Sequence, residues 1–168
     1  MKSEVTFLHC GERLQEHLKE EIDEILGIVD FIEWEKEFSF VKNDKLLEHQ
    51  TAYNERFKGE FEQLGWESQP RLSTNPSLIG DFEKNLVFVE VQFGNSATLY
   101  RDFYKFQYGL SNGLTSLNVL IVPCDPPKFF PTRPRSVVNM AEYKLALRYF
   151  TVLPISAPTM IIGLVPGS

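Results

Sequence analysis

The sequence has few cysteines, and the two it has are isolated. Cys10 and Cys124 lie far apart, and neither belongs to a CxxC motif or to a cluster of Cys and His. Two cysteines are too few for the disulfide framework of a small secreted domain, and the spacing of metal-binding Cys and His is missing. We therefore expect a reduced, cytoplasmic protein without a structural zinc site.

The sequence also lacks a long hydrophobic run. The N-terminal residues MKSEVTFLHC do not contain the apolar stretch of a secretory signal, and the longest apolar tract, residues 151–165, is interrupted by Pro154 and Pro158. A membrane-spanning helix needs about 20 consecutive apolar residues, and a secretory signal needs a central apolar segment. We expect neither an exported protein nor a membrane-embedded one.

Positive net charge is absent as well. The formal net charge is -6 at pH 7, whereas proteins that coat nucleic acids without sequence preference need many Lys and Arg to neutralise phosphates. The charge argues against nonspecific coating of nucleic acid. It is compatible with a local basic face.

What is present is the composition of one globular domain. The 168 residues are 43% hydrophobic and 24% charged, which is close to the average of globular proteins. A chain of this length can bury roughly two thirds of the surface that its unfolded form exposes. The 14 Phe recur with Leu, Ile and Val at strand and helix spacings and predict an aromatic core. We expect a single domain spanning residues 1–168.

The periodicity of apolar residues predicts alternating helices and strands. Helical spacing predicts helices at residues 11–29, 47–64, 96–108 and 136–149, with Gly65 as a C-terminal cap. Strand formers predict strands at residues 34–41, 77–82, 86–93, 118–124 and 159–165, the second and third joined by a turn at residues 83–85. Residues 125–135, with four prolines, predict a stiff loop. Strand, helix and strand after residue 86 predict a right-handed crossover between parallel strands. The fold class is therefore α/β, with a mixed central sheet flanked by helices.

The segment GDFEKNLVFVEVQFGN, residues 80–95, carries a polar pattern within the predicted hairpin. Because side chains alternate along a strand, Glu90 and Gln92 project from the same face. A turn centred near Asn85 or Leu86 places Asp81 across the hairpin from Glu90, where cross-strand neighbours stand ~5 Å apart at Cβ. Two carboxylates at that distance repel unless a cation lies between them, and Mg²⁺ prefers such oxygen ligands. The pattern indicates a site where Mg²⁺ could polarise a phosphate.

A simpler interpretation of the same residues stays open. Asp81 can be a turn residue at a strand end, with Glu90 and Gln92 on the solvent face of a half-exposed strand. The crossover helix argues against this interpretation, because a strand followed by a crossover is buried on both faces. A carboxylate buried there without a partner is costly.

The motif resembles that of a known family. Asp81, eight intervening residues, Glu90, one residue and Gln92 resemble the active-site motif of BglII-like type II restriction endonucleases, members of the PD-(D/E)xK nuclease superfamily. Most of that superfamily has lysine at the last position, and this branch is similar in using glutamine. The resemblance is strongest over residues 81–107 and extends more loosely to the first helix and to VLIVP at residues 119–123. It implies a restriction-endonuclease-like core and hydrolysis of DNA phosphodiester bonds.

The resemblance also implies roles for single residues. Asp81 and Glu90 would bind the catalytic Mg²⁺, the backbone carbonyl of Val91 would be a further ligand, and Gln92 would orient the attacking water. Glutamine is neither a general base nor a cation, so charge neutralisation falls on the metal. Asn95, in the loop after the strand, is a candidate for reading adenine through its amide. Its alternative role is to cap the following helix.

Several cations are candidates for contacts with DNA phosphates. They are Lys84 in the hairpin turn, Arg101 and Lys105 on the crossover helix, and Arg133 and Arg135 in the proline-rich loop. Each has the alternative of being an ordinary solvated charge. Glu21, on the first helix, is a further candidate for an acid on the metal side. His9, His17 and His49 show no ligand spacing.

The predicted function is a Mg²⁺-dependent, sequence-specific DNA endonuclease. We expect a homodimer, because two-fold protein symmetry matches the symmetry of a short palindrome, and the resemblance implies a GATC-like centre. Two alternatives stay open: a noncatalytic DNA-binding or scaffold protein with the nuclease fold, and a nuclease that recognises DNA structure. The ending GLVPGS resembles part of an engineered protease-site linker, so we expect the natural chain to end near Ile162 or to continue differently.

Overall fold

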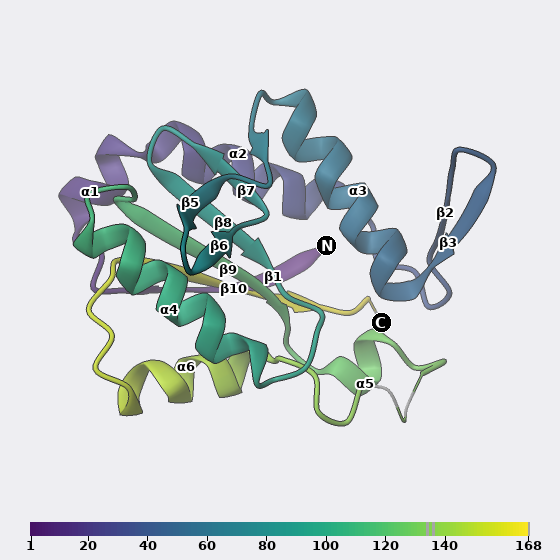
Figure 1. Cartoon of the computed structure of the whole chain (residues 1–168). Coiled ribbons are helices and arrows are strands. Elements are labelled where there is room, and N and C mark those ends of the chain that lie inside the picture. Colours follow the sequence, from purple (N-terminus) through teal and green to yellow (C-terminus); the bar gives the residue numbers. More distant parts are fainter. Residues whose placement is uncertain (134, 136, 168) are drawn as a thin grey trace.

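A six-stranded mixed sheet lies at the centre of the computed structural model, which describes residues 1–133, 135 and 137–167 (Figure 1). Its middle strands β8 (Val87–Val91), β9 (Leu117–Pro123) and β10 (Thr159–Val165) are parallel. At one edge β1 (Lys2–Leu8) runs antiparallel to β10; at the other, β7 (Phe82–Lys84) runs antiparallel to β8 and β4 (Glu67–Ser68) to β7. The middle strands are nearly continuous apolar runs, as expected of parallel strands covered on both faces.

Helices cover both faces of this sheet (Figure 1). Val87, Val89 and Val91 point to the face covered by α2 (Lys19–Phe31) and α3 (His49–Gln63). Phe88, between them in sequence, packs against α4 (Thr98–Ser111) and α6 (Tyr143–Val152) on the other face. The alternation along β8 therefore decides that Glu90 faces α4, on the same side as Phe88. The predicted fold class, α/β with a mixed sheet between helices, is confirmed.

Two small hairpins lie outside the main sheet. The first pairs β2 (Ser39–Lys42) with β3 (Lys45–Glu48), and the second pairs β5 (Arg71–Thr74) with β6 (Ser77–Ile79). The first replaces the single strand predicted at residues 34–41, and the second lies in a segment expected to be irregular. Figure 1 shows the first hairpin projecting beyond the body of the molecule at the start of α3.

The N-terminal region differs from its prediction in two ways. The amphipathic stretch forms two helices, α1 (Glu12–His17) and α2, which meet at Leu18. No glycine or proline marks that break in the sequence. Strand β1 was not predicted, because its sequence KSEVTFL is only partly apolar and its partner β10 lies at the other end of the chain.

The hairpin that carries Asp81 turns at Asn85 and Leu86, the predicted centre of the turn, although residues 83 and 84 belong to the strand rather than to the turn. Lys84 pairs with Val87, so the loop consists of Asn85 and Leu86, whose φ angles are 48° and 66°. Positive φ at both central residues matches the right-handed twist of the strands, and asparagine tolerates it well. The predicted hairpin and the parallel pairing of β8 with β9 are both confirmed.

The C-terminal third contains the remaining elements. The proline-rich segment begins with a short helix, α5 (Pro126–Phe129), capped by the Asp125 side chain. The helix predicted at residues 136–149 forms later, as α6, and α4 ends at Ser111 rather than near Gly109. Strand β10 runs through Val165, so residues 163–165 belong to the sheet. Among the described residues, none of the helices is long and apolar enough to cross a membrane.

Candidate active site

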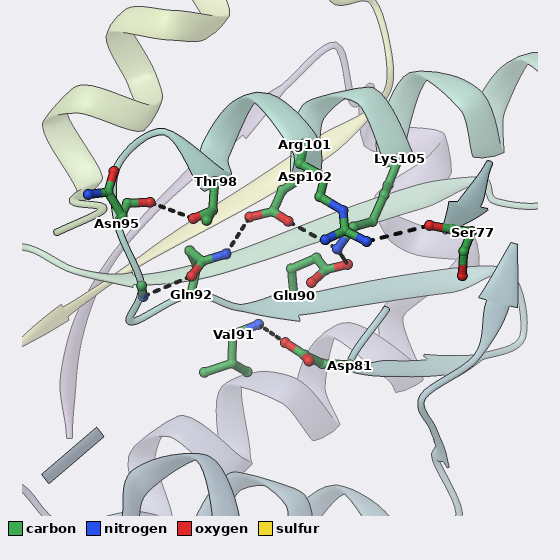
Figure 2. A network of polar contacts seen from close by, with 11 residues as sticks. Ser77, Asp81, Glu90, Val91, Gln92, Asn95, Thr98, Arg101, Asp102 and Lys105 are labelled. Carbon is green, nitrogen blue, oxygen red and sulfur yellow. Dashed lines mark hydrogen bonds and ion pairs between the residues drawn. The ribbon is translucent and has the colours of Figure 1, made fainter. Parts of the chain in front are cut away.

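Asp81 lies directly before β7, at the end of the hairpin opposite its turn. Phe82 pairs with Val89, so the antiparallel register brings Asp81 beside Glu90. The backbone N–H of Asp81 donates to the Val89 carbonyl at 3.2 Å. The Asp81 carboxylate in turn accepts the backbone N–H of Val91 at 2.7 Å (Figure 2). The acid thus occupies the position in the ladder where a backbone carbonyl would otherwise stand.

Glu90 points from β8 toward α4 and meets a lysine there. The Nζ atom of Lys105 lies 2.6 Å from Oε1 of Glu90 and 3.1 Å from Oδ1 of Asp102. The side chains of these three residues are only 7%, 5% and 2% exposed, respectively. Asp102 and Lys105 are three residues apart and so lie on the same side of α4. The central strand and the crossover helix are therefore joined by a buried ion-pair cluster.

Gln92 follows directly after β8, two residues beyond Glu90, and extends the same cluster. Its Nε2 donates to Oδ2 of Asp102 at 2.8 Å, and its Oε1 accepts the backbone N–H of Gly94 at 2.8 Å (Figure 2). The Asp102 carboxylate consequently bridges Lys105 and Gln92. The alternation predicted for Glu90 and Gln92 is what places both side chains on the α4 face.

The electrostatics of the cluster follow from its burial. Burial, together with the carboxylates of Asp102 and Asp81, raises the pKa of Glu90 well above its usual range, and Lys105 opposes this shift. Burial also raises the pKa of Asp81, against the hydrogen bond from Val91. For Lys105, burial alone would lower the pKa, but the carboxylates of Glu90 and Asp102 outweigh it and raise the pKa. Strongly perturbed acids that share a partner are typical of functional sites.

A cavity opens beside Asp81 on the α3 side of the sheet. Its volume is about 190 Å³, and its lining includes Asp81, Val91 and three residues of α3, namely Asn54, Glu55 and Lys58. The backbone N–H of Val91 points toward Asp81, and the carbonyl of the same strand residue points the same way. Space for small oxygen-rich groups therefore exists where Asp81 and the Val91 carbonyl come together.

The oxygen groups near Asp81 suit a hard divalent cation that takes only a few of its ligands from the protein. Among the described residues, no three His, Cys, Asp or Glu side chains are grouped closely enough to hold a metal by themselves. Mg²⁺ commonly binds through one or two carboxylates and fills its other positions with water and substrate phosphate oxygens. Asp81, Glu90 and the Val91 carbonyl are groups of that kind, so the residues present are compatible with Mg²⁺.

The relatives of the chain agree with this geometry. A family model described as restriction endonuclease BglII/BglIII matches residues 3–164. The chain belongs to the BglII/BglIII restriction endonuclease family. The predicted resemblance is thereby confirmed, and membership makes the protein a type II site-specific deoxyribonuclease.

Two solved structures have the same fold. The crystal structure of restriction endonuclease BglII complexed with a DNA 16-mer matches with a TM-score of 0.79 and 16% identity, over 99% of this chain and 78% of that chain. The crystal structure of free BglII matches with a TM-score of 0.69 and 19% identity, over 99% of this chain and 81% of that chain. A search of curated proteins found no match.

Two predicted site residues of this BglII/BglIII family member lie away from Asp81. Lys84 sits at the turn end of β7, three residues from Asp81 and so about 10 Å along the strand. It pairs with Glu24 of α2 at 2.8 Å. Glu21 is buried, and its Oε1 accepts a hydrogen bond from Nδ2 of Asn85 at 2.7 Å, which stabilises the turn. Both residues tie α2 to the turn end of the hairpin, and their predicted roles, a DNA contact for Lys84 and an acid on the metal side for Glu21, stay predictions.

Lys105 also differs from its prediction. It was predicted, with Arg101, to contact a DNA phosphate or else to be an ordinary solvated charge, but its side chain points into the protein and pairs with Glu90. Arg101 does lie on the exposed side of α4, where it donates to the Ser77 carbonyl at 3.4 Å. Residues four apart on a helix, such as Arg101 and Lys105, differ by about 40° in direction around the helix axis. At the edge of a buried helical face, that difference is enough to leave one side chain exposed and the other buried.

The remaining predicted DNA contacts lie in exposed loops. Oδ1 of Asn95 accepts the backbone N–H of Ala97 at 2.9 Å, just before α4, so the side chain stabilises the helix entry in this conformation. Arg133 and Arg135 are both exposed. The structure leaves the expected DNA roles of these three residues open.

Asp102 was missed by the sequence analysis, although the sequence contains a signal for it. Leu99, Phe103 and Phe106 predict the buried face of α4. Asp102 follows Leu99 by three residues and precedes Phe106 by four, so it falls within that face. A charged residue on a buried helical face needs a partner. That rule would have pointed to an interaction between Asp102 and the polar face of β8.

Proposed function

We propose that this chain cleaves double-stranded DNA at a short palindrome and that it uses Mg²⁺ bound by Asp81, Glu90 and the Val91 carbonyl. The observation that carries the proposal is the hairpin, which brings Asp81 beside Glu90 within a BglII/BglIII family domain. A divalent cation bound there would polarise the scissile phosphate and lower the pKa of a bound water.

The residues of the chain have distinct tasks in this proposal. Asp81 is held in place by the Val91 N–H and faces the cavity, so it is positioned to bind the cation from that side. Glu90 approaches from the α4 side. Gln92 orients the attacking water, for which it gives up one of its two present partners, Asp102 or Gly94. Asn95 reads adenine in a GATC-like centre, and Arg101, Arg133 and Arg135 contact phosphates.

We further propose that two copies of the chain form a dimer through the tyrosine face, defined here as Tyr100, Tyr104 and Tyr149. Tyr100 and Tyr104 on α4 are 50% and 51% exposed. The ring of Tyr149 on α6 stacks on Tyr100 with a centroid distance of 4.7 Å. Exposed aromatic groups of this kind are enriched in protein interfaces. The two free thiols, Cys10 and Cys124, accord with a cytoplasmic location.

The proposal is tested by incubating plasmid DNA with the protein and Mg²⁺. Asp81→Asn and Glu90→Gln keep the shape of each side chain but remove its charge, and Asp81→Ala and Glu90→Ala remove the ligand atoms. Asp23→Ala, at an exposed pair with Lys19, is the matched control. We expect discrete fragments from the wild type and from Asp23→Ala, and none from the four site variants or after addition of EDTA.

Other outcomes of this experiment distinguish the alternatives. Smeared products that depend on Asp81 and Glu90 would indicate a nuclease that recognises DNA structure. If folded wild-type protein cut no DNA with any divalent ion, the enzymatic proposal would fail and a noncatalytic DNA-binding protein would remain.

A further inference from the structure

The side chains of Glu90 and Gln92 both end at the same pair of residues on α4. Nζ of Lys105 donates to Oε1 of Glu90 at 2.6 Å, and Oδ2 of Asp102 accepts from Nε2 of Gln92 at 2.8 Å. The pair is itself linked, because Lys105 donates to Asp102 at 3.1 Å. Figure 2 shows the four side chains as one continuous network between β8 and α4.

This network supplies a charge that the strand does not. Gln92 is neutral, so β8 and the residue after it contribute carboxylate and amide groups but no cation. Asp81, Glu90 and Asp102 bring three negative charges when ionised, and Lys105 brings one positive charge. The remaining two negative charges are what one divalent cation balances. Lys105 thus brings the group of acids to the charge that suits a single Mg²⁺.

The geometry also limits how Glu90 can turn. A glutamate side chain has three rotatable torsions, and its carboxylate is fixed only where partners hold it. Lys105 binds one oxygen, Oε1, which leaves the second oxygen available for another ligand. Asp102, buried at the base of the pair, restrains the ammonium in turn.

We propose that Lys105, restrained by Asp102, is a positioning residue for DNA cleavage, which holds the Glu90 carboxylate in its working orientation and supplies the positive charge that Gln92 lacks. The inference rests on the proposed nuclease function. It assigns to α4 a part of the site that the motif on β7 and β8 does not contain.

A purely structural ion pair makes a different prediction. Buried ion pairs commonly contribute little net stability, and their charge has no task beyond satisfying each partner. In that case any substitution that leaves the protein folded would leave the cleavage rate unchanged. Three variants separate the effect of the charge at residue 105 on the cleavage rate from the effect of its position in the site.

The variants are Lys105→Gln, Lys105→Arg and the double variant Gln92→Lys/Lys105→Gln. Lys105→Gln removes the charge but keeps a hydrogen-bond donor. Lys105→Arg keeps the charge. The double variant moves the cation from α4 to position 92, directly after β8 and beside Asp102, so the total charge of the cluster is unchanged. Each is compared with wild type for single-turnover cleavage of the site that the wild-type digestion defines, for DNA binding with Ca²⁺ in place of Mg²⁺, and for thermal unfolding.

We expect Lys105→Gln to lose roughly 10²- to 10³-fold in cleavage rate, as is typical when one charged or polar group is removed from a preorganised site. DNA binding should change by less than about threefold, because Lys105 is buried and does not reach the DNA surface. Lys105→Arg should recover at least about a tenth of the wild-type rate, since it restores the cation and keeps Gln92. The double variant restores the cation but lacks Gln92, so it should cleave faster than Lys105→Gln and more slowly than Lys105→Arg.

Two results would overturn the inference. One is a folded Lys105→Gln that cleaves at the wild-type rate. The other is a pair of folded cation-bearing variants that cleave no faster than Lys105→Gln. If Lys105→Gln does not fold, Lys105→Arg decides, because it keeps both the positive charge and Gln92: cleavage supports the inference, and loss of cleavage by the folded variant refutes it. Failure of the wild type to cut DNA would instead refute the proposed function, so the two failures are distinct.

Discussion

Lys105 and Glu90 form an ion pair in which Nζ and Oε1 are 2.6 Å apart, and both side chains are almost fully buried. The pair joins the central strand to the crossover helix at the point where the candidate site lies. Its burial, and the two further acids beside it, set the pH behaviour and the stability of this region.

The first prediction concerns Glu90→Gln in protein freed of divalent ions. The pKa of Glu90 is raised in the folded state, so its ionisation opposes folding. Stability from this group is fully present below the unfolded pKa and is lost as pH rises through the folded pKa. Because glutamine does not ionise, Glu90→Gln should gain stability over wild type as pH rises, with no gain at low pH. Urea unfolding at several pH values with EDTA measures this, and a variant less stable than wild type at alkaline pH would contradict it.

Gln92→Leu tests the bridge between β8 and α4. The substitution removes the donor to Asp102 and the acceptor of the Gly94 N–H. Loss of a partner from a buried polar group costs about 1–3 kcal/mol. We expect a loss of that size in the free energy of unfolding from urea titration. Gln63→Leu, at the exposed end of α3, is the control and should change it by less than about 0.5 kcal/mol.

Asn95→Asp and Asn95→Ala separate base reading from helix entry. Aspartate keeps the oxygen that accepts the Ala97 N–H but loses the amide donor. Asn95→Ala should cost about 1 kcal/mol of stability, while Asn95→Asp should keep it. If Asn95 reads adenine, the free-energy difference between specific and nonspecific DNA binding should fall by about 1–3 kcal/mol in both variants. An unchanged ratio, measured by competition binding, would leave Asn95 with the helix-entry role alone.

Gly80→Ala should disturb the site through packing. A Cβ on Gly80 would lie 2.2 Å from the Phe88 ring, and Phe88 is fully buried. Overpacking of this kind costs about 1–3 kcal/mol, and the displaced backbone belongs to the residue next to Asp81. Both thermal stability and cleavage rate should fall. Gly59→Ala, with open space around its Cβ within α3, is the matched control and should gain roughly 0.5–1 kcal/mol. If Gly80→Ala were as stable as the wild type, the Phe88 ring would have to be able to move away from the added methyl group.

Tyr100→Glu/Tyr104→Glu tests the proposed dimer. Charges placed within the tyrosine face would have to be desolvated on association, so the double variant should sediment as a monomer where the wild type sediments as a dimer. Val41→Glu, at an exposed position of the first hairpin, controls for added charge and should leave the dimer intact. A wild type that sediments as a monomer at every concentration, with or without DNA, would refute the dimer itself.

The central part of the fold was predictable because its signals are local. The apolar runs of β8 and β9 and the turn between β7 and β8 depend on neighbours in sequence, and the hairpin register follows from the turn. Strand β1 could not be predicted in the same way, because it is stabilised by pairing with β10 at the other end of the chain. The break at Leu18 likewise has no local signal, and nothing in the structure explains it.

The sequence alone determined that Asp81 would lie beside Glu90 on the hairpin and that Glu90 and Gln92 would share a face, because strand alternation and hairpin pairing obey fixed geometry. Only the tertiary structure decided what those side chains touch. The packing of α4 over β8 turned Lys105 from an expected surface cation into the partner of Glu90, and it placed Asp102 against Gln92. Contacts between a helix and a strand depend on how the two elements are placed in space, and that placement is set by the whole core rather than by any local pattern.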